Sequence, residues 1–183
     1  MKNIVVFAGN DTKKDKEKYY FNLAYETGRL LAKSGFTTIT GGGPGLMNEI
    51  LRGAFENGGK TIGIRLLIEG RTHSTFVSEY ILFKDLAPRQ EKLLKMGDAF
   101  LALPGGIGTI YEIVAVLSHK RKGEILHTKP LILIDDYFLA FKRLMNKMVE
   151  EAFLNYDFGK YLQYSKSPQE AVASLNRLLK SQI

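Results

Sequence analysis

Apolar residues along the chain fall into two kinds of segment, which alternate. In the first kind, consecutive positions are almost all apolar or β-branched; these segments are residues 4–8, 37–40, 61–64, 80–83, 99–103 and 130–134. Such near-continuous runs are typical of parallel strands that helices cover on both faces. We therefore expect strands at these places.

In the second kind of segment, apolar residues recur every three or four positions, which is the spacing of one helix face. We expect helices over residues 19–34, 46–57, 86–96, 109–119, 137–151 and 168–179. Gly35 and Gly58 follow the first two, where helices commonly end, and Pro168 suits the first turn of the last. The alternation of strands and helices predicts an α/β fold with a mostly parallel sheet flanked by helices.

The composition narrows the class of protein. The chain has 183 residues, 45% of them hydrophobic, and no repeat or linker divides it, so we expect one domain over residues 1–183. It has no cysteine, which excludes disulfides, thiolate catalysis and cysteine-bound metal clusters. The histidines, His73, His119 and His127, are too scattered for a metal site, so no metal is expected.

Charge and the N-terminal sequence bear on partners and location. No apolar run approaches the roughly 18 residues of a membrane span, and the first residues lack the pattern of a signal peptide. We therefore expect a cytoplasmic protein without a membrane partner. The net charge of +7 alone leaves nucleic acid, a membrane surface and a small anion open as ligands. The lysine-dense residues 10–18 read either as a solvated loop or as a lid over an anionic ligand.

Two glycine clusters each follow a predicted strand and lead into a predicted helix. They are residues 41–45 (GGGPG) and 105–108 (GGIG), and Thr109 adds a hydroxyl beside the second. Ligands of open α/β sheets bind at the carboxyl ends of the strands, where glycine lets backbone amides approach an anion. The clusters therefore predict phosphate binding; the alternative is that they are only tight turns.

The spacing within these clusters excludes the two commonest nucleotide motifs. The turn after the first predicted strand, at Gly9 and Asn10, lacks the G-x-G-x-x-G pattern of dinucleotide sites, and no Gly-Lys-Ser/Thr follows either cluster. The pattern favours a mononucleotide or a sugar phosphate over NAD or ATP hydrolysis.

Several charged residues have two interpretations. Glu112 stands three residues after Thr109, as in a capping box, yet a carboxylate there also faces the cleft and could bind ribose hydroxyls. Arg89 reads as a surface charge from its surroundings alone. Asp135 and Asp136 end the last predicted strand and suit the capping of the next helix.

The motifs resemble those of a known family. Residues 104–112 (PGGIGTIYE) match the PGGxGTxxE motif of the LOG ("lonely guy") family, whose members are often labelled "possible lysine decarboxylase". Residues 41–47 (GGGPGLM) match its GGGxxGLM turn, and Gly9 stands at its small first turn. The first-helix spacing also matches, at Ala24, Gly28, Ala32 and Gly35. The resemblance covers about residues 4–150.

The resemblance implies a fold, an activity and site residues. Enzymes of the family are Rossmann-like three-layer sandwiches and homodimers that cleave nucleoside 5′-monophosphates, including AMP and cytokinin nucleotides, to free base and ribose 5-phosphate. It implies that Arg89 and Glu112 are catalytic, without metal or cofactor. The implied phosphate-binding residues are Gly105, Gly106, Gly108 and Thr109, with Gly42, Gly43 and Gly45 on the other side. Gly9, Asn10 and Met47 are further expected substrate contacts.

The sequence also departs from the family pattern. Residues 86–90 (LAPRQ) replace its usual Met-His and Arg-Lys pairs, and residues 64–66 lack the proline that usually ends the third strand. Because these positions would contact the base or ribose, the departures favour a substrate other than a cytokinin.

The sequence bears on three other functions. Decarboxylation with pyridoxal phosphate is disfavoured, because residues 118–120 (SHK) only partly match a cofactor-lysine motif. A nucleotide or molybdenum-cofactor carrier could use the same glycine turns, but binding phosphate requires neither Arg89 nor Glu112. Nucleic-acid binding rests on net charge alone, without a recognised module. The expected partner is therefore a small phosphorylated nucleotide.

Overall fold

The computed structural model describes residues 1–180, together with their side chains except at 156–158 and 180. The strands are β1 (Asn3–Phe7), β2 (Thr37–Thr40), β3 (Thr61–Leu66), β4 (Glu79–Phe83), β5 (Ala99–Ala102), β6 (Leu131–Ile134) and β7 (Gln163–Ser165). The α-helices are α1 (Lys14–Lys33), α2 (Leu46–Glu56), α3 (Leu86–Met96), α4 (Ile107–Lys122), α5 (Leu139–Glu150) and α6 (Pro168–Lys180). Short 3-10 helices, η1 (Asp136–Phe138) and η2 (Tyr156–Tyr161), lie before and after α5.

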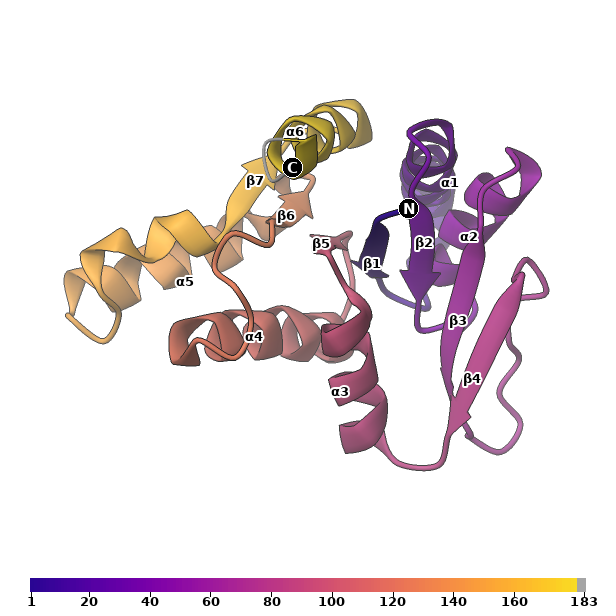
Figure 1. The fold of residues 1–183 in the computed structure, drawn as a ribbon, viewed down its shortest axis with the longest axis horizontal. Coiled ribbons are helices and arrows are strands. Elements are labelled where there is room, and N and C mark those ends of the chain that lie inside the picture. The colour runs from indigo at the N-terminus through magenta and orange to yellow at the C-terminus, as the bar shows by residue number, and fades with distance from the viewer. Residues whose placement is uncertain (181–183) are drawn as a thin grey trace.

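The strands form one sheet in the order β4-β3-β2-β1-β5-β6-β7, and each neighbouring pair is parallel (Figure 1). In the central strand, Val5 lies opposite Ile39 of β2 and Phe100 of β5. A helix connects most successive strands, whereas β3 is joined to β4 by the irregular residues 67–78. The sheet grows outward from β1 in both directions, which is the Rossmann-like arrangement and confirms the predicted α/β class.

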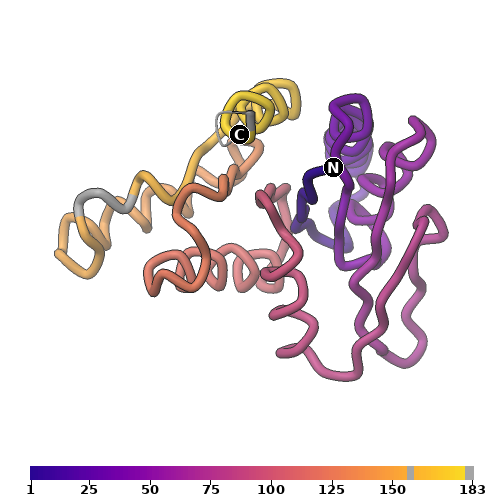
Figure 2. The backbone as a smooth tube through the Cα atoms, viewed as in Figure 1, coloured from indigo at the N-terminus to yellow at the C-terminus, as the bar shows by residue number. Residues whose placement is uncertain are grey.

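Alternate strand side chains face two apolar cores, one on each side of the sheet. Ile4 and Val6 of β1 contribute to the core covered by α1, α2 and α6, whereas Val5 and Phe7 contribute to the core covered by α3, α4 and α5. The smooth backbone trace shows the same two groups of helices (Figure 2). Burial of one such side chain stabilises a fold by roughly 1.5–3 kcal/mol. Helices on both faces make the fold the expected three-layer sandwich.

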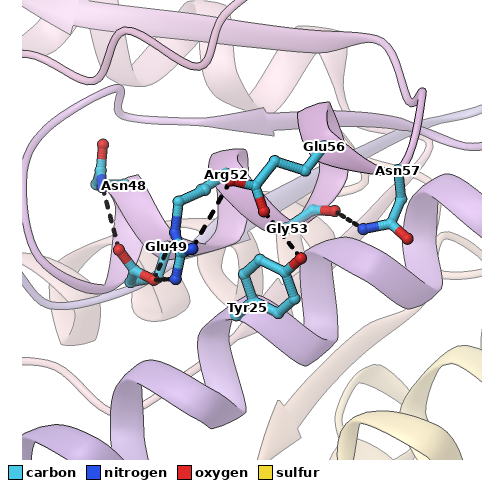
Figure 3. A network of polar contacts seen from close by, with 7 residues as sticks. All are labelled: Tyr25, Asn48, Glu49, Arg52, Gly53, Glu56 and Asn57. Atoms are coloured by element: carbon cyan, nitrogen blue, oxygen red, sulfur yellow. Dashed lines mark hydrogen bonds and ion pairs between the residues drawn. The ribbon is translucent and has the colours of Figure 1, made fainter.

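Helices α1 and α2 pack closely enough that their contact requires glycine. A Cβ atom on Gly28 would stand 1.9 Å from the backbone oxygen of Ile50. Around this contact, the Tyr25 hydroxyl donates to Glu56 Oε2 at 2.9 Å, and the Arg52 guanidinium lies over the Tyr25 ring at 4.7 Å (Figure 3). These contacts fix α2 against α1 and so hold the glycine turn from which α2 starts.

The largest differences from the predicted elements are strand β7 and the start of α1. Strand β7 was not predicted, because its three residues include no apolar run. Helix α1 begins at Lys14, not at residue 19, so the lysine-dense segment proposed as a loop or lid is mostly helix. The predicted helix ends are confirmed at Gly35 and Gly58, both with φ of 74°, and Pro168 is the first residue of α6.

Candidate active site

A cavity of about 430 Å³ opens at the carboxyl ends of β1, β2, β3 and β5. Of the predicted site residues, those that line it are Gly9, Asn10, Met47, Arg89, Gly106, Gly108, Thr109 and Glu112. Within the described residues, Asn10 Oδ1 is buried without a hydrogen-bond partner, which leaves it available to a ligand. The structure therefore brings both predicted catalytic residues and one glycine turn to a single cavity.

The second glycine turn presents the N terminus of α4 to this cavity. Gly106 is the N-cap residue of α4, and no side chain caps the helix there. A Cβ atom on Gly106 or Gly108 would meet no atom within 4 Å, so the backbone is open at these positions. Uncapped amides and the helix dipole make such a terminus a binding site for phosphate or another anion. Gly105 lies just outside the cavity lining, packed against Gly9.

The capping-box interpretation of Thr109 and Glu112 is wrong. Helix α4 begins at Ile107, two residues before the predicted start, because Gly106 takes the N-cap position. Thr109 is buried in the first turn, and Glu112 lies too far along the helix to cap it. The Glu112 carboxyl group is therefore free to serve the cavity.

The first glycine turn supports the cavity more than it lines it. Gly41 is in the lining, whereas Gly42, Gly43 and Gly45 are not. Gly45 has φ of 67°, and a Cβ atom there would stand 1.4 Å from the backbone oxygen of Asn10. Here the tight-turn interpretation describes the geometry, because the turn packs against the backbone that follows β1.

Arg89 and Glu112 form a buried pair across the cavity. Their nearest charged atoms, Nη1 and Oε1, are 3.7 Å apart, and the two side chains are 11% and 13% exposed. Arg89 Nε also donates to the backbone oxygen of Ile64 at 2.8 Å, which fixes the guanidinium at the end of β3. The interpretation of Arg89 as a surface charge is therefore wrong.

Burial dominates the electrostatics of this pair. It raises the pKa of Glu112 to about 7, although the positive charge of Arg89 opposes the shift. Burial also lowers the pKa of Arg89, with Glu112 acting against the change and Arg71 adding to it. Glu112 thus exchanges its proton near neutral pH, while the guanidinium remains charged because an arginine starts from so high a pKa.

Three polar cavity residues were not predicted, and one of them, Asp11, directly follows Asn10. Arg71 and His73 lie on the segment between β3 and β4, and both line the cavity. The segment is anchored where Ser74 donates its N–H to the Gly42 oxygen at 3.0 Å and accepts from Arg65 Nη2 at 2.6 Å. The available signal was position: a polar segment directly after a predicted strand meets the other glycine turns at the same sheet edge.

A second group of side chains holds the α4 turn from the β6 side. The Tyr137 hydroxyl donates to the Gly105 oxygen at 2.7 Å, and Asp135 Oδ1 accepts from the Tyr137 N–H at 2.8 Å. This confirms the predicted capping role of Asp135, which adopts a strained φ of 92°. Asp135 also accepts from the Tyr19 hydroxyl, and this hydrogen bond raises the pKa of Tyr19 to about 12.

The described residues hold no group of three or more histidine and carboxylate side chains able to bind a metal. None of the helices described here has the length and apolarity of a membrane span. Lys120, from the partial cofactor-lysine match, lies near the far end of α4 from the cavity, where Nζ donates to the Tyr161 oxygen at 2.9 Å.

The family model described as "Possible lysine decarboxylase" matches residues 39–175, which is most of the chain. The chain belongs to this family, the LOG family. The match spans both glycine turns and the Arg89–Glu112 pair.

Individual LOG relatives cover nearly the whole chain. Cytokinin riboside 5′-monophosphate phosphoribohydrolase LOG1 of Arabidopsis thaliana is 30% identical over 179 residues, 95% of this chain and 82% of the relative. The cytokinin riboside 5′-monophosphate phosphoribohydrolase of Rhodococcoides fascians is 30% identical over 161 residues, 84% and 78% of the two chains. Among solved structures, the Moco carrier protein from Chlamydomonas reinhardtii is 26% identical, with a TM-score of 0.71 and 98% of both chains covered.

Proposed function

We propose that this LOG protein hydrolyses the N-glycosidic bond of a nucleoside 5′-monophosphate to free base and ribose 5-phosphate. The observation that carries the proposal is that buried Arg89 and Glu112 line the same cavity as the N terminus of α4. A phosphate site beside a carboxyl group of near-neutral pKa suits cleavage of a glycosidic bond. The names of the Arabidopsis and Rhodococcoides relatives point to the same reaction.

The proposed reaction assigns a task to each part of the cavity. The 5′-phosphate binds the open amides at Gly106 and Gly108. The oxygen of water joins C1′ of the ribose, the bond from C1′ to the base nitrogen breaks, and a water proton passes to the base. Ionised Glu112 stabilises the positive charge that develops on the sugar and accepts hydrogen bonds from its hydroxyls. Arg89 donates to the leaving base or orients the water.

Incubation with AMP, followed by chromatography for adenine and ribose 5-phosphate, tests the proposal. We expect Glu112→Gln and Arg89→Ala to lower kcat by about a hundredfold or more, because each removes a group acting on the transition state. Thermal unfolding would verify that both variants fold, and Arg89→Lys provides a milder substitution. Glu91→Gln, at an exposed ion pair on α3, is the matched control. Unchanged AMP hydrolysis in both site variants would contradict the assignment.

The solved structure of the Moco carrier protein motivates a second candidate, a carrier of the molybdenum cofactor. The phosphate of that cofactor could bind the same α4 terminus. Binding alone gives no reason to bury an arginine beside a carboxyl group, which favours the hydrolase. Tight retention of the cofactor together with no base release from any nucleotide would favour the carrier.

We also propose that the protein acts as a homodimer in the cytoplasm. Leu86 and Ile107 are 48% and 86% exposed and stand beside the cavity, and Tyr111 and Val114 extend the exposed apolar surface along α4. A second copy of the chain would cover such a surface. The cytoplasmic location follows from the substrate, because free nucleoside monophosphates are intracellular metabolites.

A further inference from the structure

Arg71 lines the cavity, and the proposed reaction gives its positive charge no role. Within the described residues, no carboxylate forms an ion pair with its guanidinium, and no hydrogen bond to a protein group occupies it. The backbone around it is held, since Arg71 N–H donates to the Ile68 oxygen at 3.2 Å and Ser74 is tied to Gly42. A positioned guanidinium without a protein partner, in a cavity that also holds Arg89, is available to a ligand.

The position of Arg71 separates it from the proposed phosphate site. A Cβ atom on Gly43 would stand 2.9 Å from Arg71 Nη2, which places the guanidinium over the turn that follows β2. In the sheet, β1 lies between β2 and β5, so β2 is two strands from the strand that leads into α4. At about 4.8 Å per strand, the ends of β2 and β5 lie roughly 10 Å apart. That span suits a nucleotide with its phosphate at α4 and its base near Arg71.

The side chains around Arg71 can hold a flat, polar ring. Leu66 and Leu86 supply apolar surface to the cavity. His73 lines it too, and its Nδ1 atom is buried without a partner among the described residues. A base packed on the leucines would meet hydrogen-bonding groups only at its edge.

We propose that Arg71 selects substrates whose base presents an oxo group at that edge, as hypoxanthine and guanine do. A guanidinium has only donors, so it pairs with an edge that has only acceptors, such as O6 and N7 of guanine. Adenine places an amino donor at the same position. An apolar substituent on that amino group would meet the charged guanidinium, which disfavours the prenylated bases of cytokinins. This inference rests on the proposed hydrolysis and specifies its substrate class.

The test is kcat/KM for IMP, GMP, AMP and N6-isopentenyl-AMP in the wild type and in Arg71 variants. We expect the wild type to prefer IMP and GMP over AMP by between about fivefold and a hundredfold, as for a good bidentate pair. Arg71→Ala should remove the preference. Arg71→Gln should reverse it, because glutamine pairs with N6 and N7 of adenine. Arg143→Ala, at an exposed arginine of α5, removes the same charge elsewhere and should leave the ratio unchanged.

The outcomes separate this inference from the proposed function. Equal or better cleavage of AMP by the wild type would overturn the selectivity while leaving the hydrolase intact. An equal loss for every nucleotide in Arg71→Ala would overturn it as well, since that result indicates a phosphate contact. If no nucleotide is cleaved, the proposed function fails. Calorimetric Kd values for IMP and AMP, in the wild type and in Arg71→Ala, then decide the selectivity by the same comparison.

Discussion

At the scale of single residues, burial gives the site its chemical character. Glu112 is covered by protein and faces one guanidinium at 3.7 Å, yet its pKa of about 7 shows that loss of water outweighs that attraction. The burial of this pair could not be predicted from the composition of the sequence. Composition around Arg89 indicated a surface charge, and only the motif resemblance placed it in the site, because burial depends on how α3 lies against the sheet.

The Glu112 pKa predicts a dependence of stability on pH. The folded pKa of about 7 exceeds the ordinary 4.5, so the folded state binds the proton more tightly than the unfolded state. Stability therefore falls as pH rises from about 4.5 to 7 and remains lower above that range. Glu112→Gln removes this loss. We expect its Tm advantage over the wild type to be larger at pH 8 than at pH 5, measured by differential scanning fluorimetry.

Glu69→Gln provides the control for this comparison, because Glu69 is exposed on the segment between β3 and β4. Its Tm difference from the wild type should be small at both pH values. A Glu112→Gln difference that does not grow with pH would show that Glu112 is not held protonated by burial.

At the scale of elements, the sequence predicted the regular parts and missed the boundaries that matter most. Near-continuous apolar runs predicted β1 and β5 because both are buried on two faces. Strand β7 lies at the sheet edge with little burial, so it carries no apolar pattern. The start of α4 was missed because a glycine N-cap is indistinguishable from the other glycines of its turn. The backbone conformation of these glycines decides which of them is the N-cap.

The contact between η1 and the α4 turn predicts a positioning role for Tyr137. Its hydroxyl holds the Gly105 oxygen, and such a hydrogen bond is worth roughly 1 kcal/mol, or about a fivefold change in binding. Tyr137→Phe should therefore raise KM for nucleotides and Kd for inorganic phosphate by about that factor, with kcat nearly unchanged. Steady-state kinetics and calorimetry measure the two quantities.

Tyr111→Phe is the matched control, because this substitution removes an exposed tyrosine hydroxyl from α4 itself. An unchanged KM in Tyr137→Phe, or a fall in kcat alone, would exclude the positioning role.

At the scale of the whole molecule, one sheet edge gathers residues that are far apart in the sequence. The carboxyl ends of parallel strands meet there, so Asn10, Arg71, Arg89 and Glu112 share a cavity. The order of strands and helices made this edge predictable. The position of Arg71 in the cavity was not predictable, because residues 67–78 have no periodic pattern and their course is set by contacts with Gly42.

The exposed apolar surface on α4 predicts self-association. We expect light scattering after size exclusion to give about twice the chain mass of 20.6 kDa. Val114→Lys should shift the protein toward a monomer, because it places a charge in a desolvated interface. Leu126→Lys changes an exposed apolar residue outside the helices and should leave the mass unchanged. A wild-type monomer at micromolar concentration would contradict the proposed dimer.

Main-chain contacts hold the turns around the cavity to one another. Gly9 N–H donates to the Pro104 oxygen at 3.1 Å, Leu46 N–H donates to the Gly9 oxygen at 3.2 Å, and Gly45 touches Asn10 too closely for any Cβ atom. A side chain added at these contacts would therefore displace the backbone of the turns. Adaptation to a new substrate is left to the rim, where residues 67–78 and the start of α3 carry replaceable side chains. Diversification within this fold should thus concentrate on base recognition while phosphate recognition stays constant.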